Sequence, residues 1–231
     1  MIFKNCGNPN PPLVAVAHGS RRFGASDNVE RLIYHVGQTR PDLEIILCYL
    51  ERTEPSFFKV IEKVPTSSVV VPLILSRGFH IFSDIQGNCS RYSIKSTPPL
   101  GPDPILSEVI VERLMEAGAP LGTPVVLAAA GSSCREGTED VEAAALDLSH
   151  KLRVRVEVGY LNGSGNSIIE ASQRLRSEFG EFAIAPYLLS PGNFIALANS
   201  VEARWIASPL GSDRKIARLI LRRYDYSLAC D

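Results

Sequence analysis

Apolar segments of strand length alternate along the chain with segments in which apolar residues recur at helical spacing. This alternation predicts parallel sheets whose faces are covered by helices. In the N-terminal half the predicted strands are LVAVA (13–17), LEIILCYL (43–50) and SVVVPLIL (68–75).

The segments between these strands predict helices. The first is capped by Asp27 and ended by Pro41, and its apolar residues recur at spacings of three and four: Val29, Leu32, Ile33 and Val36. The second, 55–64, begins with a proline, which a first helical turn accepts. A polar loop follows the third strand, and a helix over 104–118 closes this half before a linker at 119–124.

The second half of the chain repeats the first at an offset of about 112 residues. Such self-similarity predicts duplicated structural units. We therefore expect two α/β halves, residues 1–118 and 124–231, each a doubly wound parallel sheet, with a cleft between them. The matching segments are VAHGS (16–20) with AAAGS (128–132), CYLE (48–51) with GYLN (159–162), 70–80 with 184–194, and 98–103 with 208–213.

The duplication separates scaffold residues from functional ones. Glycine, leucine and proline recur at matched positions: Gly19 and Gly131, Leu50 and Leu161, Pro72 and Pro186, Gly78 and Gly192. Three polar residues do not recur, because His18 matches Ala130, Glu51 matches Asn162 and His80 matches Phe194. All three follow predicted strands, at the edge where open α/β sheets bind ligands. Packing does not require them, so we predict that they are functional.

Two imidazoles and a carboxylate are ligands for a divalent cation such as iron, cobalt, nickel or zinc. An imidazole also exchanges protons near neutral pH, and a carboxylate beside it assists. His18, His80 and Glu51 are therefore the predicted metal-binding and catalytic residues, with Glu54 as an alternative for the acidic role. His35 and His150 lie in helical stretches and are interpreted as solvated or as helix-capping residues.

Basic residues gather near the same predicted edge, and guanidinium groups pair with carboxylates in a forked geometry. Arg91 and Lys95 add further positive charge, which favours a polycarboxylate ligand. Phe79 and Phe82 either flank a flat ligand or pack in the core. The predicted substrate-binding residues are Ser20, Arg21, Arg22, Ser76, Arg77, Gly78 and Phe79.

Composition narrows the class of protein. The formal net charge of −1 gives no overall field for binding nucleic acid or an anionic membrane. The five cysteines are scattered without a CxxC pair, which argues against a disulfide framework, an iron–sulfur cluster or a zinc ribbon. The N-terminus does not read as a secretory signal, and no apolar run approaches a membrane span of about 18 residues. We expect a cytoplasmic protein without nucleic-acid or membrane partners.

The segments LVAVAHGS, YLERTEPSFF and VVVPLILSRGFHIFSDI together resemble the CbiX-type class II chelatases in their double-length form. The shared pattern is HGS after the first strand, Leu-Glu before Pro-Ser, and Gly-x-His-x-x-x-Asp, present here as Gly78, His80 and Asp84. The resemblance implies ATP-independent insertion of Fe2+ or Co2+ into sirohydrochlorin, in siroheme or cobalamin biosynthesis. It also implies a substrate in the cleft between the halves. We expect a monomer or a homodimer.

The sequence contains no clear nucleotide-binding motif that would favour a different function. The sequence has no GxxxxGK[ST] phosphate loop, and LNGSGNS (161–167) is a poor match for a dinucleotide fingerprint and is interpreted as a turn. Two alternatives stay open: a carrier that binds metal or tetrapyrrole without turnover, and a histidine phosphatase. The phosphatase is less favoured because Ala17 stands before His18, where an arginine would be needed.

Overall fold

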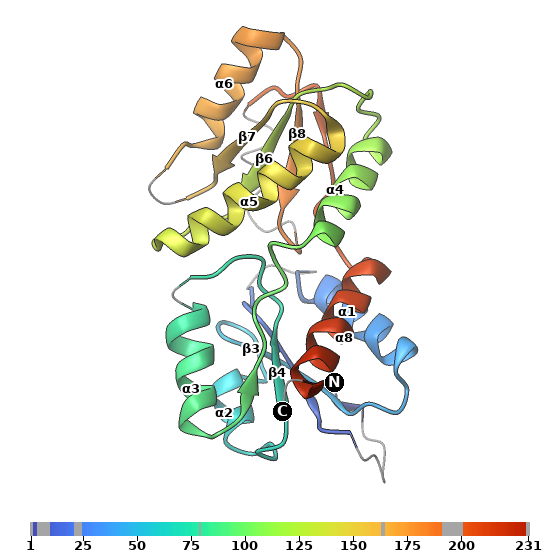
Figure 1. The fold of residues 1–231 in the computed structure, drawn as a ribbon, viewed down its shortest axis with the longest axis vertical. Helices are drawn as coiled ribbons and strands as arrows, with labels where there is room; N and C mark the ends of the chain where they lie inside the picture. The colour runs from blue at the N-terminus through green and yellow to red at the C-terminus, as the bar shows by residue number, and fades with distance from the viewer. Residues whose placement is uncertain are drawn as a thin grey trace. The chain divides into compact units, whose positions relative to one another are not determined.

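A computed structural model describes residues 2–3, 10–20, 25–78, 80–162, 165–190 and 201–229. The chain divides into two compact units, shown in Figure 1. The first unit comprises residues 1–100 and 212–231, and the second comprises residues 101–211.

The sheet of the first unit is built around β2, a strand whose five residues are all buried. Four consecutive strands of this sheet, β3, β2, β4 and β5, are parallel to one another. At the edge of the sheet, β1 pairs antiparallel with β3. In spatial order the strands are β1 (Ile2–Phe3), β3 (Ile45–Tyr49), β2 (Leu13–Ala17), β4 (Val69–Pro72) and β5 (Lys95–Ser96).

The second unit repeats this strand order in a sheet of four parallel strands. Its central strand β6 is again buried along its whole length. The spatial order is β7 (Val156–Tyr160), β6 (Val125–Ala129), β8 (Ala183–Tyr187) and β9 (Trp205–Ile206). The predicted doubly wound α/β fold is thus confirmed for each unit.

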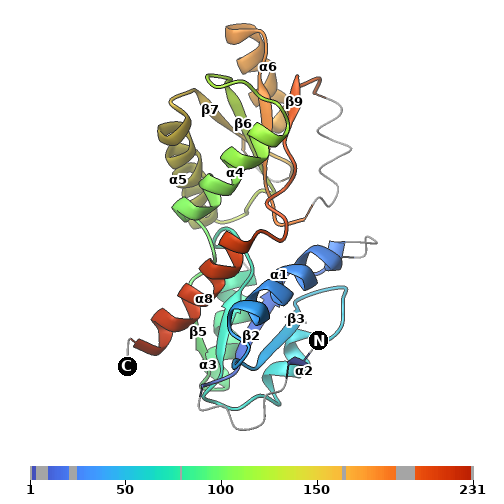
Figure 2. The same ribbon diagram turned by 90° about the vertical axis from the view of Figure 1, so that its right-hand side faces the viewer.

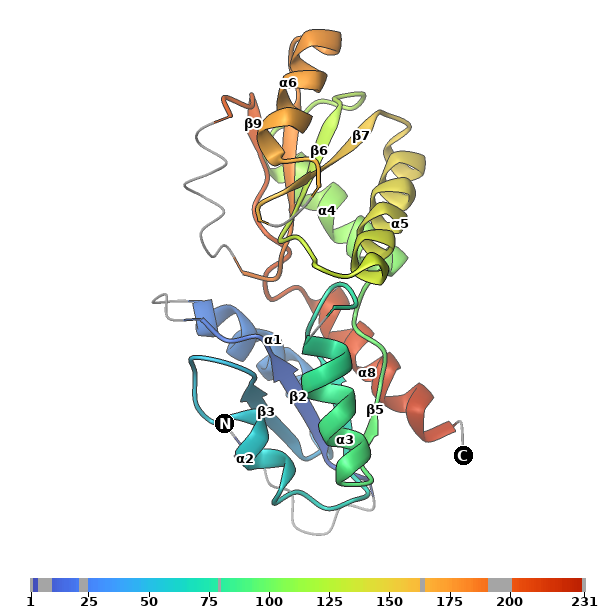
Figure 3. The same ribbon diagram turned by 90° about the vertical axis from the view of Figure 1, so that its left-hand side faces the viewer.

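Helices cover both faces of the first sheet. Figures 2 and 3 view opposite faces, one with α1 (Ala25–Thr39) and α8 (Arg214–Ala229), the other with α2 (Phe57–Ile61) and α3 (Gly87–Arg91). Alternate residues of the strands point to the two faces. The face with α2 and α3 therefore buries Val14 and Val16 against Phe57, Ile81 and Ile85.

The second sheet is covered in the same way. On one face, α6 (Ile168–Phe179) buries Ala171 and Leu175 against Val126 and Ile184. On the other face, α5 (Arg135–Leu152) and α4 (Pro104–Glu116) pack against each other and against β7 and β8. Each sheet is therefore the middle layer of an α/β/α sandwich.

The compact units differ from the sequence halves by an exchange of two helices. The helix expected to close the first half, over 104–118, is α4 and belongs to the second unit, where it packs against α5 and β8. Conversely, α8 ends the second half of the sequence but packs against α1 and β4 of the first unit. The boundary predicted at 118–124 separates the repeats, whereas the compact units divide after Leu100 and after Gly211.

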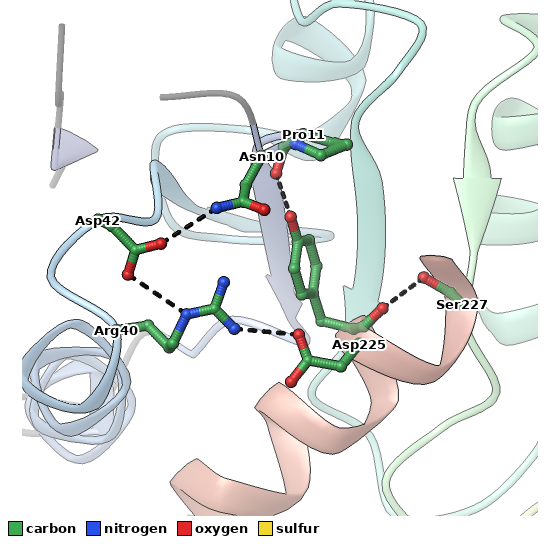
Figure 4. Close-up of polar contacts among 7 residues, drawn as sticks. Asn10, Pro11, Arg40, Asp42, Asp225 and Ser227 are labelled. Carbon is green, nitrogen blue, oxygen red and sulfur yellow. Dashed lines mark hydrogen bonds and ion pairs between the residues drawn. The ribbon is translucent and has the colours of Figure 1, made fainter. Parts of the chain in front are cut away.

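Polar contacts fasten α8 to the first unit, as Figure 4 shows. Tyr224, which is fully buried, donates a hydrogen bond from its hydroxyl to the carbonyl of Pro11, and burial raises its pKa to about 12. At the end of α1, Arg40 forms ion pairs with Asp225 at 3.1 Å and with Asp42 at 3.3 Å. Asn10 also donates to Asp42, at 3.1 Å. These contacts tie α8 to the segment that leads into β2.

Three local expectations need correction. The segment after β4 is not a polar loop, because it forms η1 (His80–Gln86) and α3, and buries Ile81, Ile85 and Cys89 at a spacing of four. Asp27 lies inside the first turn of α1 and does not cap it. Pro55 precedes the N-cap of α2 and is not its first residue.

In the part of the chain described, no helix is long and apolar enough to cross a membrane.

Candidate active site

The candidate site lies at the carboxyl ends of the strands of the first unit. From β2 the chain passes through α1 to β3 on one side, and from β4 it passes through η1 and α3 to β5 on the other. The ends of β2 and β4 therefore flank the topological switch point, where open α/β sheets bind ligands. His18 follows β2, Glu51 follows β3, and residues 76–80 follow β4.

His18 and Glu51 are held side by side by the backbone. The parallel register pairs Ala17 with Tyr49 and continues one step beyond both strands, with Leu50 N–H donating to Ala17 O at 2.9 Å. Glu51 N–H then donates to His18 O at 3.0 Å. The imidazole of His18 is exposed, with Nδ1 3.3 Å from Gly19 O, and the Glu51 side chain is 39% exposed. Two of the three predicted metal ligands thus share one edge and reach solvent.

Gly19 allows this close approach. Its φ of +93° lies in the region that glycine adopts without strain. A Cβ at this position would lie 1.8 Å from the carbonyl oxygen of Glu51, far inside van der Waals contact. Any other residue would therefore separate the loop after β2 from the turn after β3.

Thr53 joins the same two segments through its side chain. Its hydroxyl accepts a hydrogen bond from Ser20 N–H at 3.2 Å and donates one to Ser20 O at 3.1 Å. Thr53 N–H also donates to Glu51 O at 2.7 Å, which closes a tight turn. Sequence reasoning missed this residue, because one threonine in a polar turn leaves no periodic signal.

Arg52, between Glu51 and Thr53, has a left-handed backbone conformation. Its φ is +61°, a conformation that costs a residue other than glycine about 1–2 kcal/mol. The side chain is 55% exposed, and its Nε lies 3.4 Å from Glu51 Oε2. The matched residue in the second sequence half is Gly163. Sequence reasoning missed Arg52 too, although this mismatch between the repeats was visible.

Glu54, the alternative acidic residue, is engaged at the start of α2. Its Oε1 accepts a hydrogen bond from Lys59 Nζ at 2.9 Å, and its Oε2 accepts one from Ser56 N–H at 2.8 Å. The bond from Lys59 and then the bond from Ser56 hold the pKa of this carboxyl below its usual range. Glu54 therefore has a local structural partner on each oxygen.

The segment after β4 starts η1 at His80. Ser76, Arg77 and Gly78 are half-buried, and the carbonyl of Gly78 accepts hydrogen bonds from the N–H groups of the first turn of η1. A π-helical turn at this place is of the kind that often marks functional sites. In that turn Phe82 is 41% exposed, so its ring is not a core residue.

Several predicted site residues lie outside the described residues: Arg21, Arg22, Phe79 and the side chain of His80. Among the side chains described, no group of three or more His, Cys, Asp and Glu is placed to hold a metal ion. A three-ligand site at this edge would therefore need His80 in addition to His18 and Glu51, and that grouping stays a prediction.

The second unit has the same backbone without the ionisable residues. Asn162 N–H donates to Ala130 O at 3.2 Å, and Gly131, with φ +98°, would place a Cβ 1.9 Å from Asn162 O. These contacts correspond one for one to those of His18, Gly19 and Glu51. The scaffold thus forms with Ala and Asn, so His18 and Glu51 are not required for folding of this edge.

Comparison with known proteins places the chain in a family. The CbiX family model matches residues 12–117 and, a second time, residues 124–227. The chain belongs to the CbiX family. Both copies of the CbiX repeat are therefore recognisable, and the match confirms the resemblance found in the sequence.

Among curated proteins, a probable sirohydrochlorin cobaltochelatase of Halobacterium salinarum is 28% identical over 155 residues. The alignment covers 58% of this chain and 50% of that relative, so the match spans about half the length of the curated relative.

Solved structures share the fold of this CbiX-family chain. SirB from Bacillus subtilis with Fe3+ has a TM-score of 0.80 at 24% identity and covers 95% of this chain and 96% of its own. The cobalt complex of the sirohydrochlorin chelatase SirB from B. subtilis subspecies spizizenii has a TM-score of 0.78 at 21% identity, covering 94% and 95%. CbiX, the terminal enzyme of siroheme biosynthesis in denitrifying bacteria, has a TM-score of 0.71 at 18% identity, covering 95% and 99%.

Proposed function

We propose that this chain inserts a divalent metal ion, Fe2+ or Co2+, into sirohydrochlorin without ATP. The observation that carries the proposal is the contrast between the two strand edges. The same backbone hydrogen bonds and a glycine with positive φ at the same place hold His18 beside Glu51 in the first unit and Ala130 beside Asn162 in the second. Family membership and the named relatives support the same reaction class.

The metal is a substrate in this proposal. His18, His80 and Glu51 offer two imidazoles and a carboxylate, which suit iron and cobalt and leave coordination positions open for the nitrogen atoms of the macrocycle. The exposure of His18 and Glu51 fits a site that receives an ion from solvent and passes it on.

Insertion releases two protons, because two pyrrole N–H groups must lose their protons before all four nitrogens bind the metal. Glu51 accepts one proton at its carboxylate and an imidazole of the site accepts the other, and both then pass to water. The overall balance is one divalent ion and one free tetrapyrrole giving one metallated tetrapyrrole and two protons. General-base assistance of this kind contributes about 10²–10⁴ in rate.

The peripheral carboxylates of the tetrapyrrole need positive partners. Arg77, half-buried after β4, and the predicted residues Arg21 and Arg22 supply guanidinium groups for them. Ser20, Ser76, Gly78 and Phe79 complete the proposed substrate-binding set.

The test is an anaerobic assay in which sirohydrochlorin is mixed with Co2+ or Fe2+ and the visible spectrum is followed. We expect the wild-type chain to accelerate the spectral change, and His80→Ala and His18→Ala to reduce the rate by about 10² or more. Ala130→Gly in the second unit is the matched control and should retain the wild-type rate.

A carrier would bind tetrapyrrole and metal without turnover. It would shift the spectrum in proportion to protein concentration, with no acceleration over the uncatalysed reaction. That outcome, or a normal rate in His80→Ala, would contradict the proposal.

A further inference from the structure

Arg52 combines three features that a structural role does not explain together. Its backbone is left-handed, its guanidinium lies against Glu51, and its side chain is 55% exposed. The matched position in the second half is Gly163, the residue type that this backbone favours. The first unit thus keeps an arginine where a glycine would relieve strain.

The turn around Arg52 fixes where its side chain starts. Thr53 N–H bonds to Glu51 O at 2.7 Å, and the Thr53 hydroxyl is bonded to both backbone groups of Ser20. Arg52 is therefore held between two anchored residues at the same edge as His18. Strained backbone that the surroundings hold in place is concentrated at functional sites.

The contact with Glu51 leaves the forked end of the guanidinium available. Nε of Arg52 lies 3.4 Å from Oε2 of Glu51. Apart from Glu51, the guanidinium with its two terminal amino groups has no hydrogen-bond or ion-pair partner among the residues that the structure describes. Those two groups form the face that binds a carboxylate through two parallel hydrogen bonds.

We propose that Arg52 is a substrate-binding residue that holds a peripheral carboxylate of the tetrapyrrole and so orients the macrocycle beside His18 and Glu51. This inference rests on the proposed function for the identity of the ligand. It adds a carboxylate contact that the resemblance between the sequences did not suggest.

The test compares Arg52→Gly with Arg153→Gly. Arg153 is also an exposed arginine in the left-handed region, with φ +55°, but it ends α5 in the second unit. Both substitutions remove one positive charge and relieve the same backbone strain, so they differ in location and in the contact with Glu51 that Arg52 makes. Arg52→Lys keeps the charge and removes the fork.

Binding is measured without metal, by titrating the protein into uroporphyrin, which is rich in carboxylates, and into a dicarboxylate porphyrin. We expect Arg52→Gly to weaken uroporphyrin binding about tenfold and to weaken dicarboxylate binding less. Arg52→Lys should lie between Arg52→Gly and wild type. Arg153→Gly should bind as the wild type does, and both glycine variants should melt no lower than wild type.

With sirohydrochlorin and Co2+, Arg52→Gly should raise KM and leave kcat within about twofold, because the carboxylate contact persists from bound substrate to transition state. A fall in kcat with unchanged KM would mean that Arg52 acts on Glu51, and would overturn the inference. Wild-type binding by Arg52→Gly would overturn it as well.

The two proposals fail in distinguishable ways. If wild type inserts metal while Arg52→Gly binds uroporphyrin normally, the inference alone is wrong. If Arg52→Gly weakens binding but wild type shows no insertion, the inference stands and the proposed reaction is wrong. A wild-type chain that binds neither porphyrin overturns both.

Discussion

The carbonyl oxygen of Glu51 lies so close to Gly19 that a Cβ added to Gly19 would be 1.8 Å away. The N–H of Glu51 is bonded to His18 O, and its carbonyl accepts the N–H of Thr53. One peptide segment therefore contacts Gly19, the backbone of His18 and the turn that carries Arg52. Its geometry makes the candidate site sensitive to a single methyl group.

Gly19→Ala should lower both stability and activity. The methyl group must push the loop after β2 away from Glu51, which we expect to reduce the free energy of unfolding of the first unit by about 3 kcal/mol and the insertion rate by about 10². Far-UV circular dichroism reports both units, and the fluorescence of the single tryptophan, Trp205 in β9, reports the second unit. A transition seen by circular dichroism and not by fluorescence is therefore that of the first unit.

Gly118→Ala is the control for backbone strain. Gly118 has φ +77°, and nothing lies within 4 Å of an added Cβ, so this variant bears only the left-handed cost of about 1–2 kcal/mol. It should keep full activity. Equal losses in the two variants would show that the contact with Glu51 has no effect.

Glu51→Gln should mainly lower the insertion rate, whereas Glu54→Gln should mainly lower the stability. Glu51→Gln removes the carboxylate at the end of β3 and should reduce the insertion rate by about 10²–10⁴. Glu54→Gln weakens the contacts with Lys59 and Ser56 that start α2, so it should lower the melting temperature slightly and leave the rate near wild type. A large loss of rate in Glu54→Gln with a normal rate in Glu51→Gln would reverse the assignment.

The strands and the repeat could be predicted from the sequence because their signals are local. β2 begins and ends as predicted, and β3 and β4 lie inside the predicted segments. The repeat also makes His18 and Glu51 candidate site residues, because residues lost from one copy of a duplicated scaffold are not needed for its packing.

Other features left little or no local signal. The helices η1 and α3 carry Ile81, Ile85 and Cys89 at a spacing of four, a signal present in the sequence but set among polar residues. The exchange of α4 and α8 has no sequence signal, because an apolar helix face does not specify which sheet it will cover. The bonds between Thr53 and Ser20 depend on tertiary structure alone.

The helix exchange predicts how truncated chains behave. Residues 1–118 include α4 but lack α8, which packs against α1 and β4 and has Ile216, Ile220 and Tyr224 buried. We expect 1–118 not to form a folded monomer, because an uncovered apolar face promotes association. Residues 1–100 joined by a short linker to 212–231 should fold as a monomer, checked by size-exclusion chromatography and thermal unfolding. A monomeric 1–118 with cooperative unfolding would contradict the exchange.

Tyr224→Phe tests the fastening of α8 at one hydrogen bond. Removing the hydroxyl leaves the carbonyl of Pro11 without this donor and should cost about 1–2 kcal/mol in the free energy of unfolding of the first unit. Tyr34→Phe on α1 is the control, since Tyr34 is 51% exposed and its change should stay within about 0.5 kcal/mol. Equal effects of the two changes would exclude a specific role for the buried hydroxyl.

Asp42 predicts a pH dependence of stability. The hydrogen bond from Arg40 holds the pKa of Asp42 below its usual range, so the folded state binds this proton less readily than the unfolded chain does. The stabilisation by Asp42 is therefore complete above the ordinary carboxyl pKa of about 3.9 and is lost as the pH falls through the lowered value.

The measurement is urea unfolding of wild type and Asp42→Asn between pH 7 and pH 3, followed by circular dichroism. Wild type should be the more stable at pH 7, and the difference should shrink towards zero in the acidic range. In an Arg40→Met background most of this pH dependence should disappear, because the guanidinium is the largest cause of the lowered pKa. A wild-type advantage that grows as the pH falls has the wrong sign for a carboxylate held ionised, and would rule out this role for the pair.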